Sequence, residues 1–277
     1  MRRQLRLCNV QLSQTPCRGR YGALTAAPTI ALLTFMLPLA TAVASESEKT
    51  IDGSVVEVAT AGADHNQPRI VHVPEPMVFD LVRGLSAEQG EWEVNTLTRM
   101  PLGTSSSEVL WAPEIEAAVW DGVGVELELP MSNASLVAVK GAVQLRVAGN
   151  ERLAHGIQAI VEHEIQESFT LVHALYLMAW RPLDRLAFMG MAGARNAHGD
   201  GVADSVINFS GFHDAAERFR WGVELNHTQG AVWNQTLIMP QLHVELGHLA
   251  RIQLGVGAQG GTQGWSPLAS TRFIVEM

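Results

Sequence analysis

Cysteine is scarce in this chain, because its 277 residues contain only Cys8 and Cys17. Both precede residue 44, so the remainder forms neither a disulfide nor a metal–thiolate site. Long hydrophobic runs are also lacking after residue 44, which excludes a membrane-spanning helix there. No Ser-centred elbow, phosphate-binding glycine loop or paired-carboxylate motif is recognisable, so we expect no catalytic residues, no cofactor and no enzyme activity.

The first 44 residues have the features of a secretory signal. Five arginines without an acidic residue come first, a short apolar core follows at 28–39, and small residues stand at Ala42 and Ala44. We predict cleavage after Ala44, with an uncleaved anchor as the alternative. Loss of the five arginines lowers the formal net charge from −9 to −14, which makes nucleic acid an improbable partner.

Residues 45–90 read as an irregular periplasmic leader. Pro68, Pro74 and Pro76 lie close together and favour extended backbone. Residues 77–85 have the composition of a short helix. We expect this leader to be poorly ordered, and the alternative is a plug or a periplasmic contact.

From residue 91 onward the sequence alternates between apolar and polar residues. Phe219, Trp221, Val223 and Leu225 occupy one face of a strand, because successive side chains of a strand point to opposite sides. Similar patterns predict twelve antiparallel strands, at 91–99, 109–119, 122–130, 135–148, 152–165, 169–180, 184–195, 204–213, 218–228, 234–246, 249–259 and 267–277. The strand at 169–180 is apolar on both faces, so a helix is an alternative there.

The connections favour a membrane barrel over a soluble sandwich. The three longest, at 100–108, 196–203 and 260–266, are all odd-numbered, while the shortest, at 121 and 247–248, are even-numbered. A barrel with both chain ends in the periplasm needs short even connections and permits long odd ones, whereas a sandwich imposes no such alternation. We therefore predict an all-β fold, an antiparallel transmembrane barrel of about twelve strands (roughly 10 to 14) over 91–277.

Four stretches resemble a known family. The segment 112–130, the run Val223-Glu224-Leu225-Asn226, and the later segments 239–242 and 252–257 are similar to the outer-membrane barrels named for the MetA pathway of phenol degradation. The resemblance implies a porin-like barrel with a loose link to the uptake of aromatic compounds. It also implies that Pro240 is tolerated within a strand, although proline removes a ladder hydrogen bond.

The sequence Glu162-His163-Glu164 has the residue types of a metal site. On a strand, however, His163 points away from both carboxylates, so the three side chains do not share one ion. We therefore expect no metal site.

The polar strand faces predict the lining of a lumen. Charged side chains that face lipid are costly, so the low-energy arrangement turns them inward. The lumen-lining candidates are Glu114, Glu116, Glu126, Glu128, Lys140, Arg146, Glu162, Glu164, Arg220, Glu224, Arg251 and Arg272. Their excess of carboxylates predicts modest cation selectivity.

Together these features predict an outer-membrane channel of a Gram-negative bacterium for passive uptake or efflux of small molecules, with aromatic or hydrophobic compounds among the candidates. The expected partners are outer-membrane lipid, the barrel assembly machinery and a small-molecule solute. The alternatives are a soluble periplasmic β-sandwich or lipocalin-like binding protein, a filled structural barrel, and an outer-membrane enzyme.

Overall fold

The computed structural model describes residues 69–103, 108–196, 203–262 and 264–277, so the predicted signal lies outside the described residues. Among these residues no helix is long and apolar enough to cross a membrane. The long strands are β1 (Trp92–Pro101), β2 (Leu110–Trp120), β3 (Val123–Glu128), β6 (Ala138–Gly149), β7 (Leu153–Glu164), β8 (Phe169–Leu183), β9 (Leu186–Arg195), β10 (Asp204–Ala216), β11 (Phe219–Gln229), β12 (Asn234–Glu245), β13 (Ala250–Gly261) and β14 (Gly264–Glu276). A short hairpin, β4 (Met131–Ser132) and β5 (Ser135–Leu136), extends the connection between β3 and β6.

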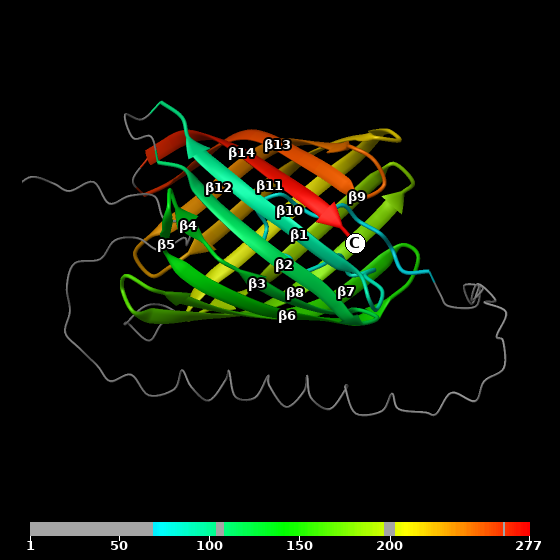
Figure 1. The fold of residues 1–277 in the computed structure, drawn as a ribbon, viewed down its shortest axis with the longest axis horizontal. Coiled ribbons are helices and arrows are strands. Elements are labelled where there is room, and N and C mark those ends of the chain that lie inside the picture. The colour runs from blue at the N-terminus through cyan, green and yellow to red at the C-terminus, as the bar shows by residue number, and fades with distance from the viewer. Residues whose placement is uncertain (1–68, 104–107, 197–202, 263) are drawn as a thin grey trace, which may run out of the picture. The chain divides into compact units, whose positions relative to one another are not determined.

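The long strands form a closed antiparallel barrel of twelve strands (Figure 1). Each strand pairs with its neighbour along the chain, and β1 pairs with both β2 and β14. The second of these pairings closes the sheet, with Glu93 opposite Glu276 and Pro101 opposite Leu268. The predicted fold class is therefore confirmed.

Side chains alternate across the barrel wall as the sequence pattern predicts. Along β3, Glu126 is 8% exposed, whereas the neighbouring Leu127 is 48% exposed. The outer surface is apolar and the interior contains most of the buried charged groups. This is the reverse of a soluble sandwich or lipocalin, whose apolar side chains face inward.

The strand connections gather at two ends of the barrel. The end that we call the turn end has the connections 121–122, 150–152, 184–185, 217–218 and 246–249. The opposite end, which we call the loop end, has the connections 102–109, 129–137, 165–168, 196–203, 230–233 and 262–263. The prediction of a long loop at 260–266 is wrong, because β13 continues to Gly261 and β14 begins at Gly264. Gly261 permits this extension, since a Cβ there would lie 2.0 Å from the carbonyl oxygen of Asn234.

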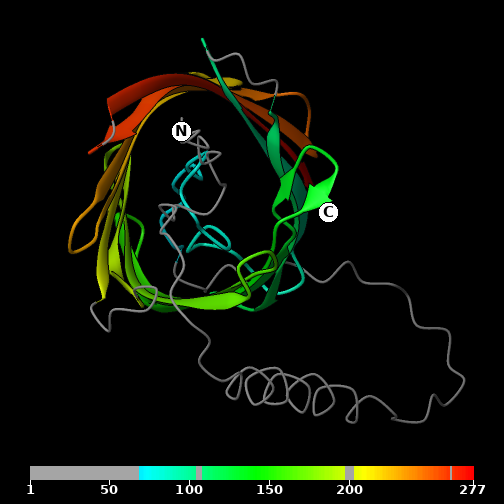
Figure 2. The same cartoon turned by 90° about the vertical axis from the view of Figure 1, so that its left-hand side faces the viewer.

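Residues 69–90, here called the inner segment, lie within the ring of strands (Figure 2). They pass from the turn end to mid-barrel and return, because Val71 donates to the Asn150 carbonyl at one end of the segment and Gly90 donates to the Ala118 carbonyl at the other. The described part of the expected leader is thus ordered and enclosed. The helix expected at 77–85 does not form; carbonyls of this stretch instead accept hydrogen bonds from wall side chains, Asp80 from Gln158 and Arg83 from Gln144.

The inner face of β7–β10 is apolar because the inner segment packs against it. Val71, Val73, Phe79 and Leu81 belong to one buried cluster with wall residues such as Ile160, Leu175, Leu177, Met189 and Phe212. This contact explains why 169–180 lacks alternation although it forms the strand β8 and not a helix.

Pro240 lies within β12, where the family resemblance implied that it is tolerated. It is opposite Val223 of β11. On its other side the ladder to β13 pairs Ile238 with Ala258 and Gln241 with Gly255, with a gap at Pro240. The missing N–H of proline therefore coincides with an interruption of that ladder.

Candidate functional site

The wall of the barrel holds the inner segment by its backbone. Glu224 on β11 accepts hydrogen bonds from the N–H groups of Met77 and Val78, at 3.0 and 3.1 Å. Long polar side chains of the wall donate to backbone carbonyls of the segment: Gln144 to Arg83, Arg146 to Leu85, Gln158 to Asp80, Arg181 to His72, Gln253 to Glu75 and Arg272 to Pro76. These bonds satisfy backbone groups that enclosure removes from water, so they fix the path of the segment.

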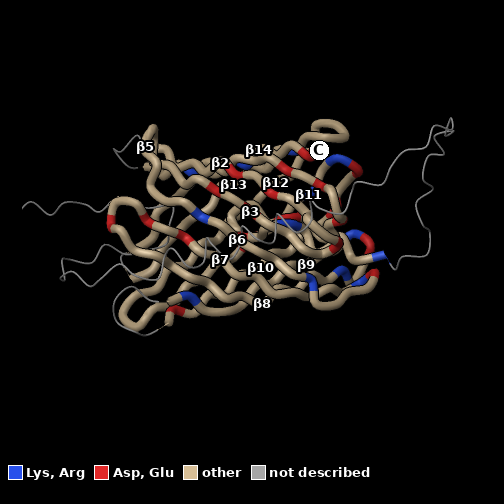
Figure 3. Tube along the Cα trace, turned by 60° about the horizontal axis from the view of Figure 1, so that its bottom comes forward, with Lys and Arg blue, Asp and Glu red and all other residues tan. Residues whose placement is uncertain are grey.

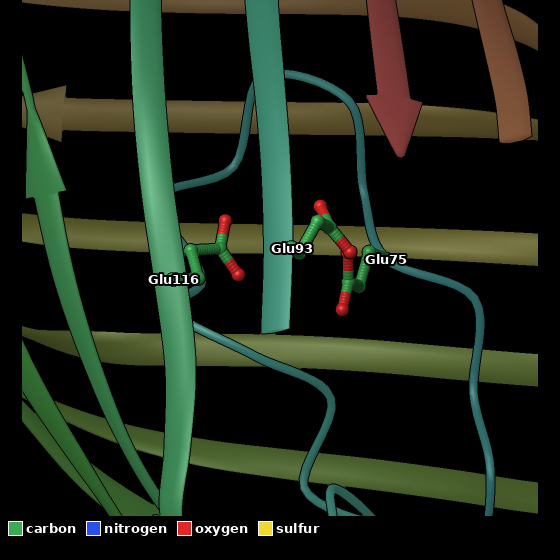
Figure 4. Close-up of side chains that lie close together, drawn as sticks. All are labelled: Glu75, Glu93 and Glu116. Atoms are coloured by element: carbon green, nitrogen blue, oxygen red, sulfur yellow. The ribbon is translucent and has the colours of Figure 1, made fainter. Parts of the chain in front are cut away.

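One charge cluster joins the inner segment to β1 and β2. Glu75 of the segment lies beside Glu93 of β1, and Glu116 follows on β2 (Figure 4). The Arg83 guanidinium donates to Glu93 at 2.7 Å, and the Arg272 guanidinium lies 3.1 Å from Glu116. Guanidinium groups therefore already neutralise part of this acidic cluster.

A second cluster surrounds Lys140 on β6. Its ammonium contacts Asp80 of the inner segment and both Glu126 and Glu128 of β3, with 3.1 Å to the Glu126 carboxylate. Glu162 of β7 is the cross-strand partner of Lys140 in register, yet it makes no ion pair with that ammonium within 4.0 Å. Four carboxylates thus surround one ammonium.

The carboxyl groups of the inner segment stay ionised in these clusters. Burial alone would raise the pKa of the Asp80 carboxyl, but the Lys140 ammonium outweighs it, and the pKa falls below its ordinary value of 3.8. Burial acts on Glu75 in the same direction, and the charges of Arg83, Arg251 and Arg272 lower its pKa below 4.5. Both of these carboxylates are therefore anions at neutral pH, and Asp80 binds Lys140 of the wall.

A cavity of about 110 Å³ lies between mid-barrel and the loop end. The apex of the inner segment, residues 77–81, forms its floor. Its apolar lining includes Met77, Phe79, Leu175, Met191 and Val206, and its charged lining includes Asp80, Arg99, Glu114, Glu128, Lys140, Glu162, Arg195 and Arg272. The space is amphipathic, with β8–β10 supplying most of the apolar side.

The twelve lumen-lining candidates are all buried or half-buried. The buried ones are Glu116, Glu126, Lys140, Glu162, Glu164, Glu224, Arg251 and Arg272, and the half-buried ones are Glu114, Glu128, Arg146 and Arg220. Most of them contact the inner segment or one another. Arg220 lies apart, near the turn end, where it contacts Asp214 at 2.5 Å and Glu245 at 3.5 Å.

His163 lies on the opposite face from its two neighbours in sequence, as the alternation predicts. Its Nδ1 atom is 3.1 Å from the hydroxyl of Thr170 on β8. Glu162 and Glu164 are instead buried inside the barrel. The three side chains are therefore not placed to bind one ion.

Sequence reasoning missed the partners that the inner segment supplies. Glu75, Asp80 and Arg83 come from the stretch expected to be a poorly ordered leader. Asp80 and Arg83 each form an ion pair with the wall, and Glu75 lies close to Glu93 and Glu116. The sequence signal for an enclosed segment was the loss of alternation in 169–180, because an apolar inner wall needs an apolar partner.

Figure 3 shows the acidic and basic positions close together at the turn end and along the wall.

All seven tryptophans of the sequence are placed near one of the two ends of the barrel. Trp92, Trp120, Trp180 and Trp221 lie near the turn end and are exposed on the outer surface. Trp111, Trp233 and Trp265 lie near the loop end. Between them the outer surface is apolar, and girdles of aromatic residues around an apolar band are typical of barrels in lipid.

Comparison with solved structures returns porins. The KdgM porin superposes with a TM-score of 0.53 at 9% identity, covering 65% of this chain and 98% of that one. The chain has a porin fold. A KdgM porin in complex with disordered oligogalacturonate gives 0.52 at 9% identity with the same coverage, and the NanC porin gives 0.49 at 12%, covering 66% of this chain and 98% of that one. No family model and no curated protein matches the sequence, so the resemblance to the MetA family is not confirmed.

Proposed function

We propose that this protein is an outer-membrane channel for small solutes and that its inner segment closes the channel in the state described. The observation that carries the proposal is the inverted barrel, which has charged groups inside, an apolar surface outside and tryptophans at both rims. An apolar outer surface of this extent is unfavourable in water and is stable in lipid.

The proposed route to the membrane follows from the sequence. The signal of residues 1–44 directs export and is cleaved after Ala44, and the barrel assembly machinery inserts the chain into the outer membrane. Amino-terminal sequencing of the protein from the cell envelope should begin at Ser45. A mature protein that retains Met1 would rule out this cleavage.

The closed state is proposed from the contents of the lumen. A barrel of about 8 strands is filled by its own side chains and one of about 16 leaves a channel, so twelve strands leave room for a further segment. Residues 69–90 occupy that room. The same observation favours a second candidate function, a permanently filled structural barrel that conducts nothing.

The charge of the interior supports a preference for cations. Among the described charged residues that are buried, eight are acidic and six are basic. Carboxylates that line a water-filled pore favour cations over anions. Although one neighbouring porin was solved with oligogalacturonate, this excess does not favour an acidic solute here. Aromatic solutes, which the MetA resemblance implies, would need the inner segment displaced, since the cavity is smaller than the ~150 Å³ that admits benzene.

Planar-bilayer recording on the refolded mature protein tests this proposal. We expect intermittent openings with a reversal potential that indicates modest cation preference in a salt gradient. The double variant E126Q/E128Q should move that potential toward zero, and the effect should shrink at high salt. The matched control E151Q/E217Q removes two charges at exposed turns and should change little. A protein that inserts but never conducts would favour the filled structural barrel.

A further inference from the structure

The lining of the cavity contains a carboxylate that no cation of the described residues contacts within 4.0 Å. Glu162 is 7% exposed and faces the cavity. It makes no hydrogen bond or ion pair with any described residue. The nearest ammonium in register, Lys140, is engaged by Asp80, Glu126 and Glu128 instead.

The other cations of the cavity wall do not contact the Glu162 carboxylate either. Arg195 is paired with Asp204 at 3.1 Å, and Arg272 is paired with Glu114 and Glu116. Arg99 also faces the cavity, and its charge acts on Glu162 without a contact within 4.0 Å. A buried carboxylate without a partner is costly, so this position favours a ligand that brings a positive charge.

A second polar atom in the cavity lining also lacks a partner among the described residues. The Nε2 atom of His173, on the strand next to Glu162, is buried and makes no hydrogen bond. His173 contributes to the lining of the same cavity. In the tautomer with the proton on Nδ1, this atom is an acceptor and suits a ligand with more than one N–H group, which a primary ammonium supplies.

The apolar residues of the cavity lining determine which class of cation fits. Met77, Phe79, Leu175, Met191 and Val206 form an apolar surface that a hydrated metal ion would leave uncovered. An alkyl group covers it while an ammonium meets the carboxylate. A volume of about 110 Å³, below the ~150 Å³ that admits benzene, limits the ligand to a few non-hydrogen atoms.

We propose that this cavity binds small primary alkylammonium compounds, with the ammonium at Glu162 and the alkyl chain on the apolar wall. The inference deepens the proposed function by naming a class of solute for the same lumen. Binding itself requires no conduction, so the two proposals can fail separately.

Calorimetric titration of the refolded mature protein in a non-ionic detergent tests the site directly. n-Propylammonium should bind saturably, and 1-propanol and propionate should bind at least about tenfold more weakly, because each lacks the charge-assisted hydrogen bond. The variant E162Q should lose about tenfold or more in affinity for n-propylammonium. The matched control E151Q, at an exposed turn, should bind as the wild type does.

A second variant tests the apolar wall without altering the charge. M191A enlarges the cavity beside Glu162 and should move the preference from n-propylammonium toward n-pentylammonium. Circular dichroism on each variant confirms that the barrel has folded. Equal affinity for 1-propanol, unchanged affinity in E162Q, or no saturable binding by the wild type would each overturn the proposal. A protein that binds n-propylammonium yet conducts no current would overturn the channel function alone.

Discussion

At Gly193 of β9, neighbouring strands approach so closely that a side chain has no room. A Cβ at this position would lie 2.1 Å from the carbonyl oxygen of Ala174 and 2.9 Å from the Cα of Leu175, both backbone atoms of β8. Backbone in a closed barrel cannot shift without disturbing the ladder on either side. Gly190 of the same strand has no neighbouring heavy atom within 4 Å of such a Cβ.

The difference between Gly193 and Gly190 yields a prediction in which the second position is the control for the first. G193A should destabilise the barrel by at least about 2 kcal/mol, because overpacking against backbone is costly. G190A should change the stability by less than about 0.5 kcal/mol. Urea unfolding in lipid vesicles measures both. Equal stability of the two variants would show that β8 and β9 are not packed as described.

Single residues also show how much of the candidate site the sequence predicts. Alternation placed Glu126 inside and Leu127 outside, because the period of a strand is two residues. It did not reveal that Lys140 contacts Glu126 and Glu128 but not Glu162, its cross-strand partner. The same ammonium also contacts Asp80, which comes from a distant part of the chain.

Among the elements, the inner segment has one apolar side and one charged side. Phe79 and Leu81 pack on β7–β10, and Asp80 contacts Lys140 across the lumen. Because the pKa of Asp80 is lowered in the folded protein, its ionised form stabilises the closed state above pH 3.8. That contribution is lost as the pH falls through the lowered pKa.

The fraction of time that the channel is open should therefore depend on pH near the pKa of Asp80. In planar bilayers the wild type should remain mostly closed from pH 7 to about 4 and open more often below pH 3.8. D80N should already open more often at pH 7 and should lose part of this dependence. D184N, at an exposed turn, serves as the matched control. Identical pH profiles of D80N and the wild type would show that Asp80 does not hold the segment.

Sequence patterns predict the strands of the barrel but not the inner segment. Most of the twelve strands were predictable because they alternate and end at turn signals, whereas β8 lacks alternation and left a helix as an alternative. The inner segment was not, because residues 69–90 have no period and take their backbone hydrogen bonds from wall side chains such as Glu224 and Gln158. The path of this irregular backbone therefore depends on side chains from distant strands.

For the molecule as a whole, the two ends of the barrel predict its orientation in the membrane. Loop-end residues face outward in a barrel of this kind, and turn-end residues face the periplasm. Single cysteines at Ser135, Glu167 and Val232 should react with an impermeant maleimide on intact cells, whereas cysteines at Asp121, Asp184 and Gly247 should not. Labelling of both sets alike would mean that this orientation is wrong. The loop positions Thr104, Ala197 and Gln263 are expected to label with the first set but lie outside the described residues.

The central claim is that the inner segment closes a channel, and a reversible tether tests it most directly. A Cβ on Gly124 would lie 3.5 Å from the Cβ of Arg83, a separation that suits a disulfide. Because the chain after Ala44 contains no cysteine, R83C/G124C would carry only this pair. The reduced variant has lost the contacts of Arg83 with Glu91 and Glu93, so it should open more often than the wild type.

Single-channel recording of R83C/G124C before and after reduction is the decisive measurement. The oxidised protein should remain closed, and addition of a reductant to the same bilayer should restore openings beyond the wild-type frequency. Equal currents in the oxidised and reduced states would contradict closure by residues 69–90.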